Sequence, residues 1–165
     1  MKIFLDTNVL IDSVIDRGFE APRKIVDSYL NSVEKLCVSY LSLANLAYIL
    51  RKFFSESEIK KLLNTISSNM KVVPGLDQHY YDLQKMSGRD IEDCLQILCA
   101  EYERCDLILT RNVEDYRGNT LIPVLTPEQF LRHCKECYIV IQGLVFRTGP
   151  CCSYARKPGY LPKND

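Results

Sequence analysis

The first stretch with chemical potential is "KIFLDTNVLID", in which an apolar run ends in Asp6, Thr7 and Asn8. Three consecutive apolar residues, 3–5, are typical of a strand that is covered on both faces. A carboxylate at the end of such a strand is costly to bury unless something pairs with it. In open α/β sheets, ligands bind beyond the carboxyl ends of the strands. Asp6 is therefore either a ligand-binding carboxylate or the N-cap of the helix that Val9 begins.

A second acidic position starts the amphipathic pattern "DIEDCLQILCAEYERC". Asp90 has the place of an N-cap, and Asp93 stands three residues later, where a capping-box acid is found. Asp93 lies one turn inside the helix, so it can point past the helix end toward the sheet. The pattern favours a capping role for Asp90 and a site role for Asp93.

A third acidic position follows the apolar run 107–109, which continues as "TRNVED". Thr110, Asn112 and Asp115 leave the end of this predicted strand as Asp6 leaves the first one. Parallel strands bring their carboxyl ends to one edge of the sheet. We therefore expect these side chains to meet.

Clustered carboxylates raise one another's pKa unless a cation lies between them. Oxygen ligands of this kind suit Mg²⁺ or Mn²⁺, which activate water and stabilise the leaving oxygen in phosphodiester hydrolysis. Zinc is disfavoured, because neither His79 nor His133 is near the cluster in sequence. Asp6, Asp93 and Asp115 are the predicted metal ligands and catalytic residues.

The elements that must position these residues alternate along the chain. Short apolar runs are separated by stretches with helical periodicity, such as "SLANLAYILRKFF" and "ESEIKKLLNTISS". This alternation predicts an α/β fold of three layers, with a mostly parallel central sheet of about five strands flanked by helices. The predicted strands are 2–5, 35–38, 71–73, 107–109 and 122–125.

The composition is that of one ordinary globular domain: 165 residues, 47% hydrophobic, 25% charged and no net charge. No secretory signal opens the chain, and no apolar run approaches the roughly 18 residues of a membrane span. We therefore expect a cytoplasmic protein without a membrane partner. Its cysteines in apolar or helical contexts are expected to be buried thiols. These are Cys37, Cys94, Cys99 and Cys105.

The pattern changes after Leu131, which divides a domain at 1–131 from a C-terminal extension at 132–165. The extension holds six basic and two acidic side chains, and its last fifteen residues lack periodicity. It is expected to be partly disordered, so truncation near Pro150 should leave folding unchanged. A zinc site built from "CKEC" and "CC" in the extension is disfavoured, because adjacent cysteines chelate one tetrahedral ion poorly.

The segments "FLDTNVLID", "SYLSLANLAYILRK", "DIEDCLQILCAEYERCDLILTRNVEDY" and "IPVLTPEQFL" resemble the PIN-domain family in order and spacing. Within that family they are most similar to the VapC-like ribonuclease toxins of toxin–antitoxin systems. The resemblance covers residues 1–131. It implies a Mg²⁺- or Mn²⁺-dependent endoribonuclease that cleaves single-stranded RNA, binds a cognate antitoxin and pairs as a homodimer.

The resemblance also implies roles for individual residues. Asp6 matches the first metal-binding Asp of the family, and Asp93 matches the Asp of the "D-x-x-D-A" helix start. Thr7 and Asn8 match the polar pair after the first Asp. The supporting segment "T-R-D" falls on Thr110, Arg111 and Asn112.

Two positions depart from the family pattern. A usual Glu is replaced by Asn45 in "LANLAY", and the Asp of "T-R-D" is Asn112; Asp115 is expected to take over that fourth position. Because an amide offers a neutral oxygen where a carboxylate offers a charge, the alternative is a catalytically degenerate PIN-like domain that binds RNA or a protein. A haloacid-dehalogenase-like phosphatase is disfavoured, since its second Asp is Asn8 here.

Overall fold

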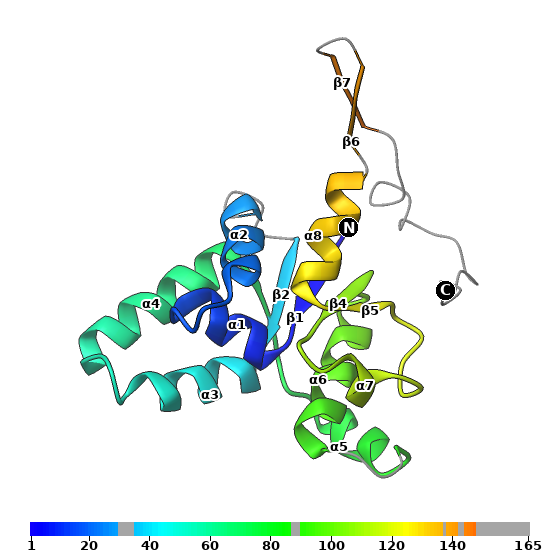
Figure 1. The fold of residues 1–165 in the computed structure, drawn as a ribbon. Helices are drawn as coiled ribbons and strands as arrows, with labels where there is room; N and C mark the ends of the chain where they lie inside the picture. Colours follow the sequence, from blue (N-terminus) through cyan, green and yellow to red (C-terminus); the bar gives the residue numbers. More distant parts are fainter. Residues whose placement is uncertain (30–34, 87–89, 137, 142–143, 148–165) are drawn as a thin grey trace.

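The computed structural model describes residues 1–29, 35–86, 90–136, 138–141 and 144–147. Within these residues the chain forms a five-stranded, fully parallel sheet in the order β3-β2-β1-β4-β5 (Figure 1). The predicted α/β fold with its parallel sheet is confirmed; the bounds of β3 and β4 are as predicted, and those of the other three strands differ by one or two residues. The strands are β1 (Ile3–Leu5), β2 (Leu36–Ser39), β3 (Lys71–Val73), β4 (Leu107–Leu109) and β5 (Val124–Leu125).

Helices cover both faces of this sheet, as Figure 1 shows. The helices α1 to α4 lie on one face, and α5 to α7 lie on the other. Helix α8 follows β5 and packs against α2. The helices are α1 (Thr7–Val14), α2 (Glu20–Tyr29), α3 (Tyr40–Leu50), α4 (Glu56–Asn69), α5 (Asp77–Leu83), α6 (Ile91–Tyr102), α7 (Val113–Tyr116) and α8 (Pro127–Glu136).

The central strand β1 shows why the run "IFL" has no polar residue. Ile3 and Leu5 pack into one core cluster with α1, α3 and α4, whereas Phe4 packs into the other cluster with α6. Successive side chains of a strand point to opposite faces, and both faces of this strand are covered. All three side chains are fully buried. The strand is therefore a rigid support for the residue that follows it.

The strand order reverses between β1 and β4. The chain runs from β1 outward through β2 to β3, and then returns to the other side of β1 to form β4 and β5. In open α/β sheets this reversal opens a crevice beyond the strand ends, where ligands bind. Asp6 follows β1 directly and Thr110 follows β4 directly, so the fold sets the first and third predicted segments side by side.

The predicted boundary at Leu131 falls inside α8, which continues to Glu136. Cys134 packs on the core beyond that boundary. An antiparallel pair of short strands follows, β6 (Tyr138–Ile141) and β7 (Leu144–Arg147). The tail expected to be disordered and the disfavoured zinc site both extend beyond the described residues. None of the described helices is long and apolar enough to cross a membrane.

The cysteines expected to be buried thiols are confirmed as such. Cys37, Cys94, Cys99 and Cys105 are buried, and none of them forms a disulfide with another described residue. All but Cys94 line the core cluster that contains Phe4. They act as small apolar side chains of the core.

Candidate active site at the carboxyl edge of the sheet

Asp6 is a buried carboxylate at the end of the central strand, only 3% exposed. Its backbone N–H donates to the Leu109 carbonyl oxygen over 3.0 Å, and Thr110 Oγ1 donates to its Oδ2 over 3.0 Å. Asp6 precedes α1, but its side chain makes no capping hydrogen bond. No Lys or Arg in the described part of the chain forms an ion pair with it. The capping alternative for Asp6 is therefore not the one the structure shows.

Burial raises the pKa of the Asp6 carboxyl, and the negative charge of Glu92 raises this pKa further. Hydrogen bonding by Thr110 acts in the opposite direction, because it stabilises the ionised form. Hydrogen bonding by the buried Tyr116 hydroxyl, which is poorly aligned with the carboxylate, also lowers the pKa of Asp6. A buried acid and a buried hydroxyl thus lie together at the switch point of the sheet.

Asp93 is the second carboxylate of this edge and stands in the first turn of α6. Burial, together with the charges of Asp6, Asp90, Asp115 and Glu92, raises its pKa to about 6. Asp6 and Asp115 are therefore both within electrostatic reach of Asp93. Asp90 caps α6 as predicted, since its Oδ1 accepts from the Glu92 backbone N–H over 2.8 Å.

The segment after β4 carries the third carboxylate. Thr110 Oγ1 accepts from the Asn112 backbone N–H over 3.1 Å while it donates to Asp6. The Asn112 side-chain amide in turn donates to Asp115 Oδ2. Asn112 thus serves to hold the carboxylate that follows it, rather than to present its own oxygen to the site.

A buried polar network supports this edge from behind. Gln96 Nε2 donates to Thr7 Oγ1 over 2.7 Å and to Ser42 Oγ over 3.0 Å, and Ser39 Oγ lies 2.9 Å from Ser42 Oγ. Buried hydroxyls and amides are stable only when such partners are present. The sequence analysis missed Gln96, although a Gln on the apolar face of a predicted helix is a signal that would have found it.

Glu92 is the other residue that the sequence analysis missed. Its Oε1 accepts from Thr7 Oγ1 over 2.8 Å and from Asn45 Nδ2 over 2.8 Å. Asn45 is therefore present at the edge, as predicted, but it faces a carboxylate of α6 with its donor group. Asn8 is exposed on the first turn of α1.

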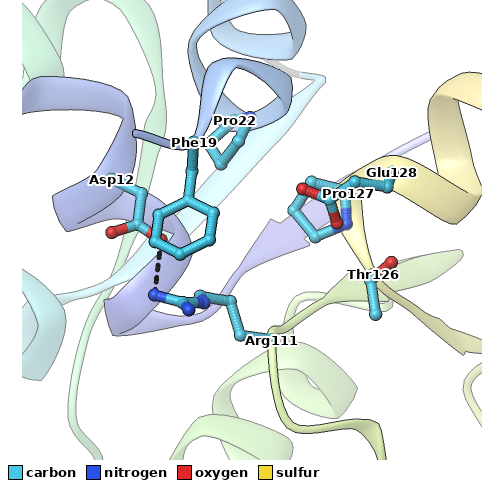
Figure 2. A pocket seen from close by; sticks show the side chains of 7 residues that line it. All are labelled: Asp12, Phe19, Pro22, Arg111, Thr126, Pro127 and Glu128. Carbon is cyan, nitrogen blue, oxygen red and sulfur yellow. Dashed lines mark hydrogen bonds and ion pairs between the residues drawn. The ribbon is translucent and has the colours of Figure 1, made fainter. Parts of the chain in front are cut away.

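Arg111 does not join the carboxylates. Its guanidinium pairs with the buried Asp12 over 3.2 Å and stacks on the Phe19 ring at 3.7 Å from the centroid. Figure 2 shows this arrangement, with Thr126 and Glu128 across a hollow of about 210 Å³. The sequence placed Arg111 among the supporting residues of the site, and the structure assigns its side chain to this neighbouring hollow.

The donor set fits a divalent cation that keeps most of its water. Among the described residues no three His, Cys, Asp or Glu side chains form a closed metal-ligand group. Mg²⁺ and similar ions bind through one or two carboxylates, waters and substrate phosphates, so a closed protein shell is not required. Asp6, which has no cationic partner among the described residues, and Asp93, whose pKa is raised by burial and by the charge of Asp6, fit such an ion.

The class of protein follows from comparison with known families. The PIN domain family model matches residues 2–114, and the chain belongs to this family. The curated protein Ribonuclease VapC1 of Aquifex aeolicus (strain VF5) is 28% identical over 139 residues, which are 78% of this chain and 92% of the relative.

Solved structures share the fold at lower identity. A toxin–antitoxin complex from Klebsiella pneumoniae matches with a TM-score of 0.58 and 21% identity, over 77% of this chain and 98% of the other. VapBC2 from Rickettsia felis, bound to a DNA fragment from its promoter, matches with a TM-score of 0.56 and 17% identity, over 76% and 98%. These likenesses agree with the three-layer fold described above.

Proposed function

We propose that this chain is a Mg²⁺- or Mn²⁺-dependent endoribonuclease that hydrolyses single-stranded RNA. The observation that carries the proposal is the pair Asp6 and Asp93 at the switch point of a PIN fold: Asp6 is a buried acid without a cationic partner among the described residues, and burial together with the charge of Asp6 raises the pKa of Asp93. Carboxylate pairs in such a position are the usual means of holding a catalytic divalent ion. The curated relative, which is named a ribonuclease, supports the same activity.

Asp6 and Asp93 would hold the ion, with Asp115 close to them. When bound, Mg²⁺ or Mn²⁺ activates water for attack on a phosphodiester and stabilises charge on the leaving oxygen. Thr110 keeps Asp6 in place and favours its ionised form. Because the pKa of Asp93 is about 6, its carboxylate is mostly ionised at neutral pH and can bind a cation.

Thr7 and Asn8 open helix α1 directly beside the carboxylates. The first backbone N–H groups of a helix attract anions, so an RNA phosphate is favoured at this point. Gln96 donates a hydrogen bond to the Thr7 hydroxyl and holds it in place. Asn8, the next residue along the chain, is exposed and carries a side-chain amide. The start of α1 thus offers neutral donors for the substrate.

A toxin role in the cytoplasm, with a cognate antitoxin as partner, completes the proposal. Its support is that the similar solved structures include a toxin–antitoxin complex from Klebsiella pneumoniae and VapBC2 from Rickettsia felis. The predicted test is co-expression with the product of any small reading frame adjacent to this gene. Co-purification of the two proteins together with loss of RNA cleavage is the expected result.

A homodimer is proposed from the exposed aromatic residues on and just after α3. Tyr40, Tyr48 and Phe53 are 67%, 66% and 65% exposed, and Phe54 is 42% exposed. By contrast, Leu46 and Leu50 of the same helix are buried in the core. A light-scattering mass of two chains is expected, and Tyr48→Glu should reduce it to one; a strict monomer for the unmodified protein contradicts the dimer.

Cleavage of labelled RNA tests the catalytic proposal. Single-stranded RNA should be cut with Mn²⁺ and left intact with EDTA, while the same sequence as duplex RNA or as single-stranded DNA should be cut more slowly. Asp6→Asn removes one charge and retains the shape of the side chain. Asp77→Asn, at an exposed position of α5, is the matched control and should cleave like the unmodified protein.

A second candidate function is an RNA- or protein-binding module without catalysis. Asn45 and Asn112 favour it, because each directs its amide N–H₂ toward a carboxylate where the family carries an acid. Retention of RNA without any Mn²⁺-dependent cleavage would select this function over the nuclease.

A further inference from the structure

We propose that Glu92 supplies to this site the carboxylate that the PIN family carries at the position of Asn45, so that the acid comes from α6 instead of α3. The inference rests on the proposed metal-dependent nuclease and adds a residue to it. Family resemblance gives Glu92 no role, and its place in the acidic stretch "DIED" does not distinguish it from its neighbours.

Two directed hydrogen bonds fix the Glu92 carboxylate beside Thr7, the residue that follows Asp6. Thr7, the residue after Asp6, donates its hydroxyl hydrogen to Glu92 Oε1, and Asn45 donates its amide hydrogen to the same oxygen, both over 2.8 Å. The two donors come from α1 and α3, whereas Glu92 belongs to α6. The position of this carboxylate is therefore fixed by contacts among three helices.

The second carboxylate oxygen of Glu92 remains available. No residue in the described part of the chain donates a hydrogen bond to Oε2, and no described Lys or Arg pairs with Glu92. In addition to burial, the negative charge of Glu92 raises the pKa values of Asp6, Asp93 and the buried Tyr116 hydroxyl. An acid that is fixed through one oxygen and lies within electrostatic reach of two further acids is suited to share a hydrated cation with them.

A helix-stabilising role does not account for these contacts. An acid in the first turn of a helix interacts favourably with the helix dipole wherever its side chain points. Asp90 already provides the N-cap of α6. The inward hydrogen bonds from Thr7 and Asn45 are therefore not required for the stability of the helix.

Glu92→Gln tests the inference by Mn²⁺ titration calorimetry at pH 7.5, with RNA cleavage as a second measurement. The substitution keeps an oxygen that accepts from Thr7 and Asn45, and it removes the charge. Mn²⁺ affinity should fall by at least about tenfold, and cleavage should fall with it. Glu101→Gln is the matched control on the same helix, where Glu101 accepts from Thr120 over 2.8 Å, and its Mn²⁺ affinity should be unchanged.

The double substitution Asn45→Glu with Glu92→Gln returns the acid to α3. It preserves the contact with the donor reversed, since the new glutamine amide donates to the new glutamate. Most of the Mn²⁺ affinity lost in Glu92→Gln should be recovered. Asn45→Glu alone should bind Mn²⁺ more weakly than the double variant, because it places two carboxylates against each other where Asn45 now contacts Glu92 over 2.8 Å.

The outcomes separate this inference from the proposed function. Glu92→Gln binding Mn²⁺ as tightly as the unmodified protein, while Asp93→Asn does not bind it, overturns the role of Glu92 and leaves the nuclease proposal intact. An unmodified protein that binds no Mn²⁺ overturns both. Glu92→Asp is the second variant if Glu92→Gln does not fold: it shortens the acid by one methylene, and unmodified Mn²⁺ affinity in this variant also contradicts the inference.

Discussion

Thr110 Oγ1 donates a hydrogen bond to Asp6 Oδ2 over 3.0 Å, although 104 residues separate them. The bond joins the first residues beyond two neighbouring parallel strands, β1 and β4. It stabilises a charge that burial disfavours, and it gives the carboxylate one orientation. The reversal of strand order at this point is the reason that two such distant residues meet.

Thr110→Val keeps the shape of the side chain and removes this bond. The free energy of unfolding should fall by about 1–2 kcal/mol, because Asp6 loses a donor in a buried place and the Asn112 backbone N–H loses its acceptor. The pKa of Asp6 should rise further, which moves the acidic limb of the cleavage pH profile upward. Urea unfolding and pH–rate profiles measure the two effects. Thr120→Val removes an exposed bond to Glu101 and, like Thr110→Val, the acceptor of a backbone N–H, but it should leave the pH profile unchanged; an unmoved pH profile for Thr110→Val would contradict the prediction.

Asp93→Asn should separate activity from stability. Cleavage should fall by orders of magnitude, since the carboxylate that helps to hold the metal loses its charge. Stability at pH 7 should rise by on the order of 1 kcal/mol, because a charge disfavoured by burial and by Asp6 has been removed. Thermal melting in EDTA and the RNA assay check both parts, with Asp77→Asn as the control. Lower stability at pH 7 would show that Asp93 makes a favourable contact in its ionised form.

The metal-free protein should gain stability as the pH falls from about 7. The pKa of Asp93 is about 6 in the folded chain against an ordinary 3.8, and burial raises the pKa of Asp6 as well. Between pH 3.8 and about pH 6 the Asp93 carboxyl is largely protonated in the folded state but ionised in the unfolded state. Protonation in this range therefore favours folding. Below about pH 4 the contribution from Asp93 is complete. Urea unfolding in EDTA from pH 7 to pH 4.5 should show a rise that Asp93→Asn reduces, and an equal rise in that variant would refute the assignment.

The fold was predictable because its main signals are local. Apolar runs such as "IFL" and "LIL" sit in a sheet covered on both faces, and the alternation of strands with helices leaves few arrangements of a parallel sheet. The strand ends at Asp6 and Thr110 followed directly from that arrangement. The boundary expected at Leu131 could not be read from the sequence in this way, because α8 continues through Leu131 to Glu136.

The site was only partly predictable, because side-chain direction depends on packing between elements. In "DIED" the sequence cannot tell which acid turns inward; the roll of α6 against the sheet turns Glu92 toward Thr7 and leaves Asp90 as a cap. The segment "TRN" poses the same problem. Thr110 turns to Asp6 while its neighbour Arg111 turns to Asp12, and only the surrounding helices determine this choice.

Arg111→Met should therefore weaken the fold and leave the metal site intact. Asp12 is buried and is held by Arg17 and Arg111, each over 3.2 Å. Loss of one partner leaves the buried carboxylate with the other, and the Phe19 ring loses the guanidinium that covers it. Because Arg111 is partly exposed, we expect a cost of about 1–3 kcal/mol rather than the full cost of an orphaned buried charge.

The matched control for this substitution is Arg117→Met. Arg117 pairs with exposed Glu114 over 3.0 Å, and surface pairs of this kind contribute about 0–1 kcal/mol. Urea unfolding should thus separate the two variants, while calorimetry should find the same Mn²⁺ affinity in both. If folded Arg111→Met binds Mn²⁺ more weakly and Arg117→Met does not, Arg111 supports the carboxylate site, as the sequence analysis had predicted. Equal stability of the two variants would instead show that Arg17 suffices to hold Asp12.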